Sequence, residues 1–167
     1  MSQNNFVHPF APIYDKTSQI LILGSFPSAK SREEGFYYGN PRNRFWEVLA
    51  RCFAEDKPEG KDEKCKFLLR HHIALYDAAL SVEIKGSMDH HMKKIVPADL
   101  TEIFSVAPAL QVFANGKKAY EILEKQGISA VYLPSTSPAN AQFSIDDLTS
   151  IWCAEIGKVL KLPKRHF

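Results

Sequence analysis

Four short apolar segments dominate the hydrophobic pattern of the chain. They are Ile20–Gly24, Ile73–Tyr76, Leu110–Ala114 and Ala130–Leu133. Their apolar residues follow one another without alternation, which is typical of strands that are covered on both faces. We therefore predict that these four segments form a largely parallel sheet.

Between and after these segments, apolar residues recur at helical spacing. The predicted helices are Asn43–Phe53, Asp62–Arg70, Asp99–Phe104, Lys117–Lys125 and Ile145–Leu160. Strands that alternate with helices predict an α/β fold, here a three-layer α/β/α sandwich with a central four-stranded, mainly parallel sheet. A length of 167 residues fits one domain over residues 1–167.

Composition narrows the class of protein without naming a function. The chain is 45% hydrophobic and 24% charged, so it can bury a core, and its net charge of +2 neither supports nor excludes nucleic acid as a partner. No apolar run approaches the ~18 residues that cross a bilayer, and the first ten residues lack the apolar stretch of a secretory signal. We expect a cytoplasmic protein.

Cysteine usage supports the same expectation. Cys52, Cys65 and Cys153 are odd in number, far apart and without a CxxC pair. A disulfide framework is therefore not expected, nor is a zinc or iron–sulfur site, and the cysteines are interpreted as small buried apolar groups in a reducing compartment. The pairs His71–His72 and His90–His91 do not change this, because adjacent side chains point in different directions and further ligands are not suitably spaced.

In an open parallel sheet, ligands bind at the carboxyl ends of the strands. The segments at these ends are Gly24–Ser31, Asp77, Asn115–Lys117 and Pro134–Asn140. They are rich in small hydroxyl residues and poor in His and paired carboxylates, so neither a strong acid–base pair nor a metal cage is expected. The nucleotide-binding patterns GxGxxG and GxxxxGK[ST] are also absent.

The segment Gly35–Trp46 combines five aromatic residues with two Asn and two Arg. Phe45 and Trp46 are interpreted as core residues. Asn40 and Asn43 stand close to a predicted helix start, where an amide can cap backbone N–H groups. Aromatic rings interleaved with cations also suit stacking on a flipped base and binding of phosphates.

Three ordered motifs resemble those of a known family. They are Gly24–Ser28 (GSFPS), Tyr37–Trp46 (YYGNPRNRFW) and Leu133–Asn140 (LPSTSPAN). Together they resemble the hypoxanthine-DNA glycosylases, also called DNA-deoxyinosine glycosylases, a branch of the uracil-DNA glycosylase superfamily. The resemblance extends from Pro9 to the last predicted helix and includes Ile73–Asp77, Ile84–Ser87 and Asn115–Tyr120.

The resemblance implies hydrolysis of the N-glycosidic bond of a deaminated base, with hypoxanthine as the first choice. The partner would be double-stranded DNA, from which the nucleotide is flipped, and water would attack a sugar cation. Such a reaction requires neither metal nor cofactor. A monomer of bacterial or archaeal type, acting in the cytoplasm, is expected, as is a monofunctional enzyme without a lysine nucleophile.

Two positions depart from the wider superfamily. Phe26 stands where many relatives carry a water-orienting Asp or Asn, and Leu133 replaces a His that stabilises the leaving pyrimidine. The resemblance to the hypoxanthine branch therefore implies that Asn43 is the catalytic amide, with Asn40 as second choice. The alternative for Asn43 is a helix cap only.

The resemblance also implies a base pocket and a DNA-binding surface. Phe26 would stack on the base or be a core residue, and Asp77 would contact base or water or cap a loop. The segment Ser135–Asn140 would contact DNA or be a rigid turn, and the basic residues would bind phosphates or be solvated surface charges. The base-pocket residues are Gly24, Ser25, Phe26, Tyr38, Asp77 and Asn115. The DNA-binding residues are Ser28, Lys30, Arg42, Arg44, Lys117, Ser135, Thr136, Ser137, Pro138, Ala139 and Asn140.

Other functions remain open at this point. One is a mismatch-specific uracil or thymine glycosylase of the same fold. Others are a DNA-damage-binding module without catalysis and a nucleotide hydrolase on a similar sheet, which would cleave free deoxyinosine.

Overall fold

The computed structural model describes residues 4–85 and 92–163. Its centre is a parallel sheet with the strand order β3-β2-β6-β7. The strands are β2 (Ile20–Gly24), β3 (Ile73–Asp77), β6 (Gln111–Asn115) and β7 (Val131–Leu133). Every residue of β2 and β3 is buried, as expected for strands covered on both faces.

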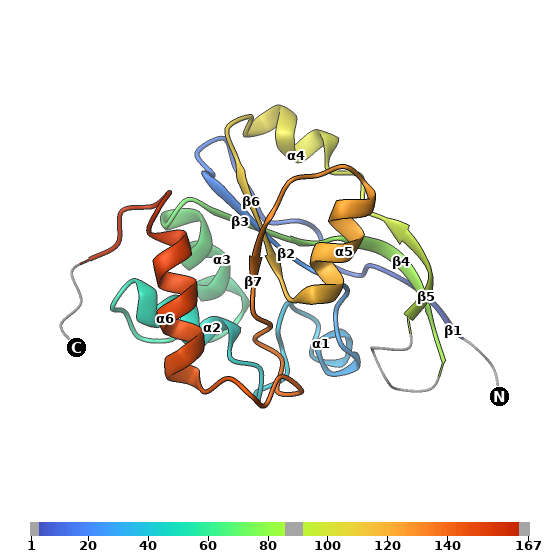
Figure 1. Cartoon of the computed structure of the whole chain (residues 1–167), viewed down its shortest axis with the longest axis horizontal. Helices are drawn as coiled ribbons and strands as arrows, with labels where there is room; N and C mark the ends of the chain where they lie inside the picture. The colour runs from blue at the N-terminus through green and yellow to red at the C-terminus, as the bar shows by residue number, and fades with distance from the viewer. Residues whose placement is uncertain (1–3, 86–91, 164–167) are drawn as a thin grey trace.

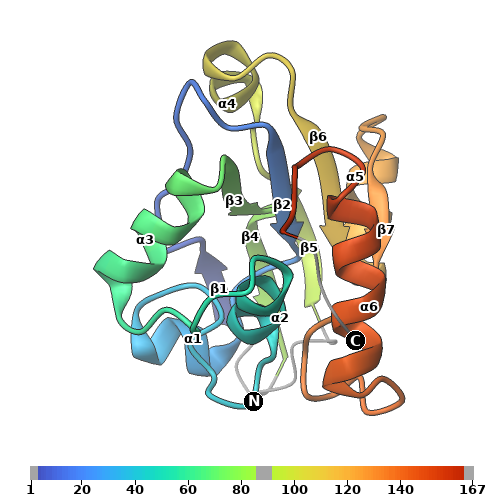
Figure 2. The same ribbon diagram turned by 90° about the vertical axis from the view of Figure 1, so that its left-hand side faces the viewer.

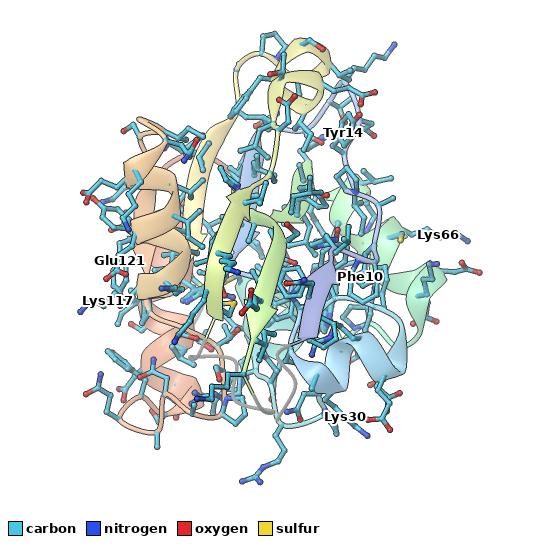
Figure 3. All side chains as sticks on the ribbon, turned by 90° about the vertical axis from the view of Figure 1, so that its right-hand side faces the viewer. Phe10, Tyr14, Lys30, Lys66, Lys117 and Glu121 are labelled. Atoms are coloured by element: carbon cyan, nitrogen blue, oxygen red, sulfur yellow. A yellow bond between two sulfur atoms is a disulfide. The ribbon has the colours of Figure 1, made fainter. Side chains whose placement is uncertain are left out.

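Helices cover one face of this sheet (Figures 1 and 2). They are α2 (Phe45–Cys52), α3 (Lys61–Arg70) and α6 (Ile145–Ile156). The opposite face carries α5 (Lys117–Lys125) and a second sheet, which faces the viewer in Figure 3. Short helices lie at the two ends of the sheet, α4 (Thr101–Val106) at the amino end and α1 (Ala29–Glu34) at the carboxyl end (Figure 1). The predicted fold class, three layers around a four-stranded parallel sheet, is confirmed.

The second sheet was not predicted. It is antiparallel, with the order β1-β4-β5, and consists of β1 (Asn4–Val7), β4 (Ala79–Ile84) and β5 (Met92–Pro97). Polar residues interrupt the apolar pattern of these strands, and Glu83 is buried beside Lys94, with 3.2 Å between Oε2 and Nζ. Helix α1 was missed as well, because its sequence AKSREE has no apolar stripe.

The predicted helices differ from the observed ones mainly at their ends. Helix α6 ends at Ile156, four residues before the predicted Leu160, and Gly157 caps it. Phe45 and Trp46 are buried core residues, as predicted, with exposed fractions of 0% and 2%. No helix within residues 4–85 and 92–163 is long and apolar enough to cross a membrane.

The expectation about the cysteines was wrong for two of the three. Cys52 and Cys153 form a disulfide, with 5.2 Å between their Cα atoms, whereas Cys65 is a free thiol. The pair is 101 residues apart in the sequence and meets only because α2 packs against α6, so spacing alone could not reveal it. Cysteine usage therefore no longer supports a reducing compartment.

Parallel register brings the candidate residues together at the carboxyl edge of the sheet. Gly24 at the end of β2 is paired with Asp77 at the end of β3. Asn115 at the end of β6 is paired with Leu133 at the end of β7. The loops that follow these residues therefore converge on one place.

Candidate active site

A pocket of about 150 Å³ opens at this carboxyl edge. It is smaller than the roughly 300 Å³ typical of sites for drug-sized ligands, so its volume suits a small group. Eleven of its twelve lining residues were predicted from the sequence, and Ser31 was not. The lining residues are Gly24, Ser25, Phe26, Ser28, Ser31, Tyr38, Asn43, Asp77, Asn115, Ser135, Thr136 and Ser137.

Asn43 combines a structural contact with a free amide group. Its Oδ1 accepts a hydrogen bond from the backbone N–H of Phe45, the first residue of α2, at 2.9 Å. Its Nδ2 has no hydrogen-bond partner within the described residues. The oxygen therefore satisfies the first N–H of α2, while the NH₂ group remains available at the pocket, and the catalytic role of Asn43 stays a prediction.

Asn40, the second choice, does not line the pocket. Its Oδ1 accepts from the N–H of Arg42 at 2.9 Å, and its carbonyl oxygen accepts from the N–H of Asn43 at 2.9 Å. Asn40 therefore shapes the turn that presents Asn43.

Asn115 has its hydrogen-bonding groups engaged by neighbours. Its Nδ2 donates to Tyr38 Oη at 3.0 Å and to Thr136 Oγ1 at 3.1 Å, and its Oδ1 accepts from the Thr136 N–H at 3.2 Å. Since both N–H groups are used, Asn115 acts as a brace between β6, the loop after β7 and Tyr38.

Tyr38 lies at the pocket in a backbone conformation that is uncommon for its residue type. Its φ is +52°, and its ring stacks on Phe45 with 4.0 Å between centroids. Burial, and to a lesser extent the negative charge of Asp77, raises the pKa of Tyr38 above its usual range. Tyr38 therefore stays a neutral phenol, and its O–H has no acceptor within the described residues.

The structure adds a residue that the sequence did not indicate. His8 lies just after β1, and its Nε2 is 2.8 Å from Asp77 Oδ2. Both side chains are almost fully buried, with exposed fractions of 0% and 5%. The sequence analysis considered only the loops at the strand ends, which are poor in His, whereas this imidazole comes from the N-terminal segment.

Gly24 has no room for a side chain. A Cβ added to Gly24 would lie 2.5 Å from Asp77 Oδ1 and 2.8 Å from Tyr38 Oη. Both oxygens therefore converge on the same spot above the glycine, which any larger residue would fill. Gly116 is restricted in a similar way: its φ is +98°, and a Cβ would lie 3.1 Å from the Cβ of Ser135.

Arg44 differs from the predicted phosphate contact. Its guanidinium donates to the carbonyl oxygens of Phe143, Ser137 (2.8 Å) and Asn140 (3.1 Å). Four of its five N–H groups point into the loop after β7, since Nε also donates to Thr136, so Arg44 fixes this loop. This correction follows from the loop's carbonyl oxygens, which no sequence pattern displays.

The segment 135–140 forms a turn held by its own residues. Ser135 Oγ accepts from the Ser137 N–H at 3.1 Å, and Ser137 Oγ accepts from the Ala139 N–H at 3.2 Å. Asn140 Nδ2 donates to the carbonyl oxygen of Ser135 at 3.0 Å. The predicted rigid turn is present, and Pro138, Ala139 and Asn140 lie beside the pocket without lining it.

The remaining candidates lie around the pocket. Phe26 is 8% exposed, so it is largely a core residue with one edge at the pocket. Ser28 caps α1 by accepting from the Ser31 N–H at 3.2 Å. Lys30 pairs with Glu34 at 3.2 Å, and Lys30 and Lys117 both point outward from the molecule (Figure 3). Arg42 is exposed.

The histidine pairs contribute nothing to the pocket. His71 contacts Glu55, with 2.6 Å between Nε2 and Oε2, and His72 Nδ1 lies 3.2 Å from Thr17 Oγ1. His90 and His91 lie outside the described residues. Within residues 4–85 and 92–163, no group of three His, Cys, Asp or Glu side chains is arranged to hold a metal ion.

Comparison with known proteins shows which proteins this chain is similar to. The chain is 34% identical over 140 residues to a curated protein of Methanosarcina acetivorans named hypoxanthine DNA glycosylase, covering 81% of this chain and 89% of that protein. It is 33% identical over 148 residues to a protein of the same name from Methanosarcina barkeri, covering 86% and 93%.

A solved structure agrees with these relatives. A solution structure from M. acetivorans, described as a candidate uracil DNA glycosylase, superimposes with a TM-score of 0.75 at 33% identity, covering 88% of this chain and 94% of that one. The sequence model described as "Uracil DNA glycosylase superfamily" matches residues 11–154, which include every pocket residue named above. The chain therefore belongs to the uracil DNA glycosylase superfamily.

Proposed function

We propose that this protein is a monofunctional DNA glycosylase that releases hypoxanthine from double-stranded DNA and leaves an abasic site. The observation that carries the proposal is the free NH₂ group of Asn43 at a one-base pocket, in a chain whose curated relatives are named hypoxanthine DNA glycosylases. The other contacts of the site support it by holding that pocket in shape.

The proposed reaction begins with flipping of the damaged nucleotide into the pocket, at a cost of about a few kcal/mol that is lower for mispaired bases. The N-glycosidic bond then breaks, its electron pair leaves with the base, and water adds to the sugar cation. Asn43 Nδ2 donates a hydrogen bond either to the departing base, where negative charge develops, or to the attacking water. An amide is too weak a base to remove a proton from water, so positioning and polarisation are the roles open to it.

No covalent intermediate is required. A bifunctional glycosylase needs an amine nucleophile at the sugar, and no lysine is among the described residues that line the pocket. The proposed reaction uses water alone and requires neither cofactor nor metal.

We further propose that the DNA backbone crosses the carboxyl edge of the sheet. Arg42 and Lys117 are exposed near the pocket and are the candidate phosphate ligands there, together with the turn at residues 137–140. The whole chain would act as one domain, as a monomer in the cytoplasm.

A uracil glycosylase is the second candidate, because the solved neighbour is described in those terms. Phe26 and Leu133 argue against it, since both replace polar residues that support uracil release in the wider superfamily.

The test is single-turnover cleavage of duplexes that carry one hypoxanthine, one uracil or no lesion, with free deoxyinosine as a fourth substrate. Alkali treatment would reveal abasic sites. The proposal expects release of hypoxanthine from the duplex and none from the free nucleoside. Release of uracil alone would assign the second candidate. No release by folded protein would contradict both and favour a damage-binding module, and cleavage of the nucleoside would indicate a nucleoside hydrolase.

A further inference from the structure

A second cavity, of about 320 Å³, lies between strand β5 and helix α5. It is separate from the candidate active site, because the two cavities share no lining residue. Both elements lie on the face of the central sheet that carries the second sheet (Figure 3). We call this cavity the β5–α5 groove. The proposed reaction does not use it.

The walls of the β5–α5 groove are basic. Among the described residues, four exposed lysines line it, two from each wall, against one glutamate, Glu121. One of them, Lys94, pairs with Glu83 at 3.2 Å, whereas the other three have no ion-pair partner within residues 4–85 and 92–163. The whole chain has a net charge of only +2, so the groove concentrates positive charge in one place and suits a ligand with several negative charges. The four lysines are Lys93, Lys94, Lys118 and Lys125.

The most deeply buried residues of the groove are apolar and form its floor. Met92 and Ile122 are 9% and 6% exposed, and Ile95 and Pro97 are half-buried. Among the described residues, no aromatic side chain lines the groove. Nucleic acid bases stack on aromatic rings, and phosphate groups gain nothing from an apolar floor. The groove therefore suits a ligand that combines negative charges with apolar groups better than it suits DNA.

Strand β5 gives the groove an unpaired backbone edge. It is the last strand of its sheet and pairs with β4 on one side only, and α5 lies on its other side (Figure 3). An extended chain can hydrogen-bond to the backbone N–H and C=O groups of such an edge. Helix α5 has nine residues, so the groove beside it is about 13 Å long. This length matches about four residues of extended chain at about 3.3 Å each.

Strand β5 is irregular, which explains why both of its lysines line the groove. In a regular strand, neighbouring side chains point to opposite faces. The register with β4 shifts between Ser81 and Glu83, and the φ of Lys94 is +48°, an uncommon value for a residue with a Cβ. Lysines and bulges keep edge strands from pairing with copies of themselves. Because a second copy of this chain would bring its own lysines to this edge, the favoured occupant is a different, acidic chain.

We propose that the β5–α5 groove binds an extended segment of a partner protein in which acidic residues alternate with apolar residues. The apolar side chains of the segment contact Met92 and Ile122 on the floor, its carboxylates pair with the lysines of both walls, and its backbone pairs with the edge of β5. Since the groove and the candidate active site share no residue, the partner and DNA can be bound together. This surface does not depend on which base the protein releases.

The first experiment measures the binding of synthetic peptides to the full chain by fluorescence anisotropy. The probe is a labelled peptide of about eight residues in which aspartate and isoleucine alternate. Two matched peptides replace every aspartate by asparagine or every isoleucine by serine. The proposal expects saturable binding of the acidic apolar peptide and an affinity at least about tenfold lower for each of the other two. Equal affinities for the three peptides, or no binding of the probe by folded protein, would contradict it.

A charge reversal on the α5 wall tests where the peptide binds. The double variant Lys118→Glu, Lys125→Glu changes two exposed residues and leaves the floor intact, and its affinity for the probe should fall by about tenfold or more. The matched control is Lys158→Glu, Lys161→Glu, which makes the same change of net charge at exposed residues after α6. Its affinity should stay within about threefold of wild type at about 0.15 M salt. Equal losses in the two double variants would show non-specific attraction and overturn the proposal. Thermal unfolding establishes that each variant is folded.

Two further measurements distinguish a peptide groove from a part of the DNA surface. In ¹⁵N NMR spectra, the probe should shift the backbone amide signals of residues 93–96 and 118–125 most, and shifts confined to the loops at the carboxyl edge of the central sheet would contradict the proposal. Undamaged duplex DNA should not displace the probe. If it does, and if Lys118→Glu, Lys125→Glu loses as much affinity for the duplex as for the probe, the groove belongs to the DNA surface and the proposal is wrong. Base release is measured separately, and its outcome leaves this inference unchanged.

Discussion

The two sides of the pocket differ in how many of their polar groups are already hydrogen-bonded. On the closed side, defined by Arg44, Asn115 and Thr136, nearly every donor is engaged by protein atoms. On the open side, defined by Tyr38, Asn43 and Asp77, each side chain makes one hydrogen bond to a protein group and keeps one polar group free. Both sides contain the polar residue types that sequence analysis selects as functional.

This difference indicates which substitutions should change the reaction and which should change the fold. A group without a protein partner can act on a ligand, whereas a saturated group maintains the shape of the site. Substitutions on the closed side should therefore reduce stability first. Substitutions on the open side should reduce activity while the protein stays folded.

The largest expected effect on the free energy of unfolding comes from the disulfide between Cys52 and Cys153, which links the two sides of the pocket. Cys52 lies in α2, which begins just after Asn43, and Cys153 lies in α6, which follows the loop held by Arg44. Cys52→Ala removes a disulfide across 101 residues, which should lower the free energy of unfolding by about 4 kcal/mol. Urea unfolding measures this free energy. Cys65→Ala is the control, and its free energy of unfolding should stay close to that of wild type. Identical transitions for wild type with and without reductant would contradict the link.

Arg44→Ala should have the next largest effect. It removes donors from the carbonyl oxygens of Ser137, Asn140 and Phe143, and the free energy of unfolding should fall by about 3 kcal/mol. Arg42→Ala, two residues away and exposed, should leave it unchanged. Equal unfolding midpoints for the two variants would show that Arg44 does not hold the loop.

Asn115→Ala should lower the free energy of unfolding somewhat less than Arg44→Ala does. It removes the hydrogen bonds that connect Tyr38 and Thr136 through Asn115. We expect the free energy of unfolding to fall by about 2 kcal/mol. In a protein of this size the melting temperature would fall by roughly 4–8 °C. Calorimetry measures the shift, and an unchanged melting temperature would place Asn115 on the open side.

The smallest effect is expected for Arg42 in DNA binding. Loss of one phosphate contact should weaken binding to all sequences alike and lower the salt dependence of the affinity by about one unit of slope. Titrations at several salt concentrations measure the slope. An unchanged slope in Arg42→Ala would remove Arg42 from the DNA surface.

The sequence was sufficient to predict the parallel sheet and most of the pocket lining. Strands such as Ile20–Gly24 are continuously apolar, and their parallel order forces the residues at their ends to one edge. The small antiparallel sheet could not be predicted in the same way. Its strands carry Glu83, Lys93 and Lys94, whose burial or pairing depends on tertiary contacts.

The roles of individual pocket residues were harder to predict than their presence. Asn43 and Asn115 are the same residue type at the same edge, and only the hydrogen-bond partners distinguish them. His8 was missed because it lies 69 positions from Asp77 in a segment without an apolar pattern. Arg44 was assigned to phosphate because a basic residue in a polar loop gives no indication of the carbonyl oxygens that surround it.

The most direct test of the account is single-turnover release of hypoxanthine by Asn43→Ala, with Asn40→Ala as the matched control from the same turn. The account predicts that Asn43→Ala slows release by about 10²-fold or more, while loss of the cap lowers the free energy of unfolding by only about 1 kcal/mol. Asn40→Ala should stay within a few-fold of wild type. Full activity of folded Asn43→Ala would contradict the assignment of the free amide as the catalytic group.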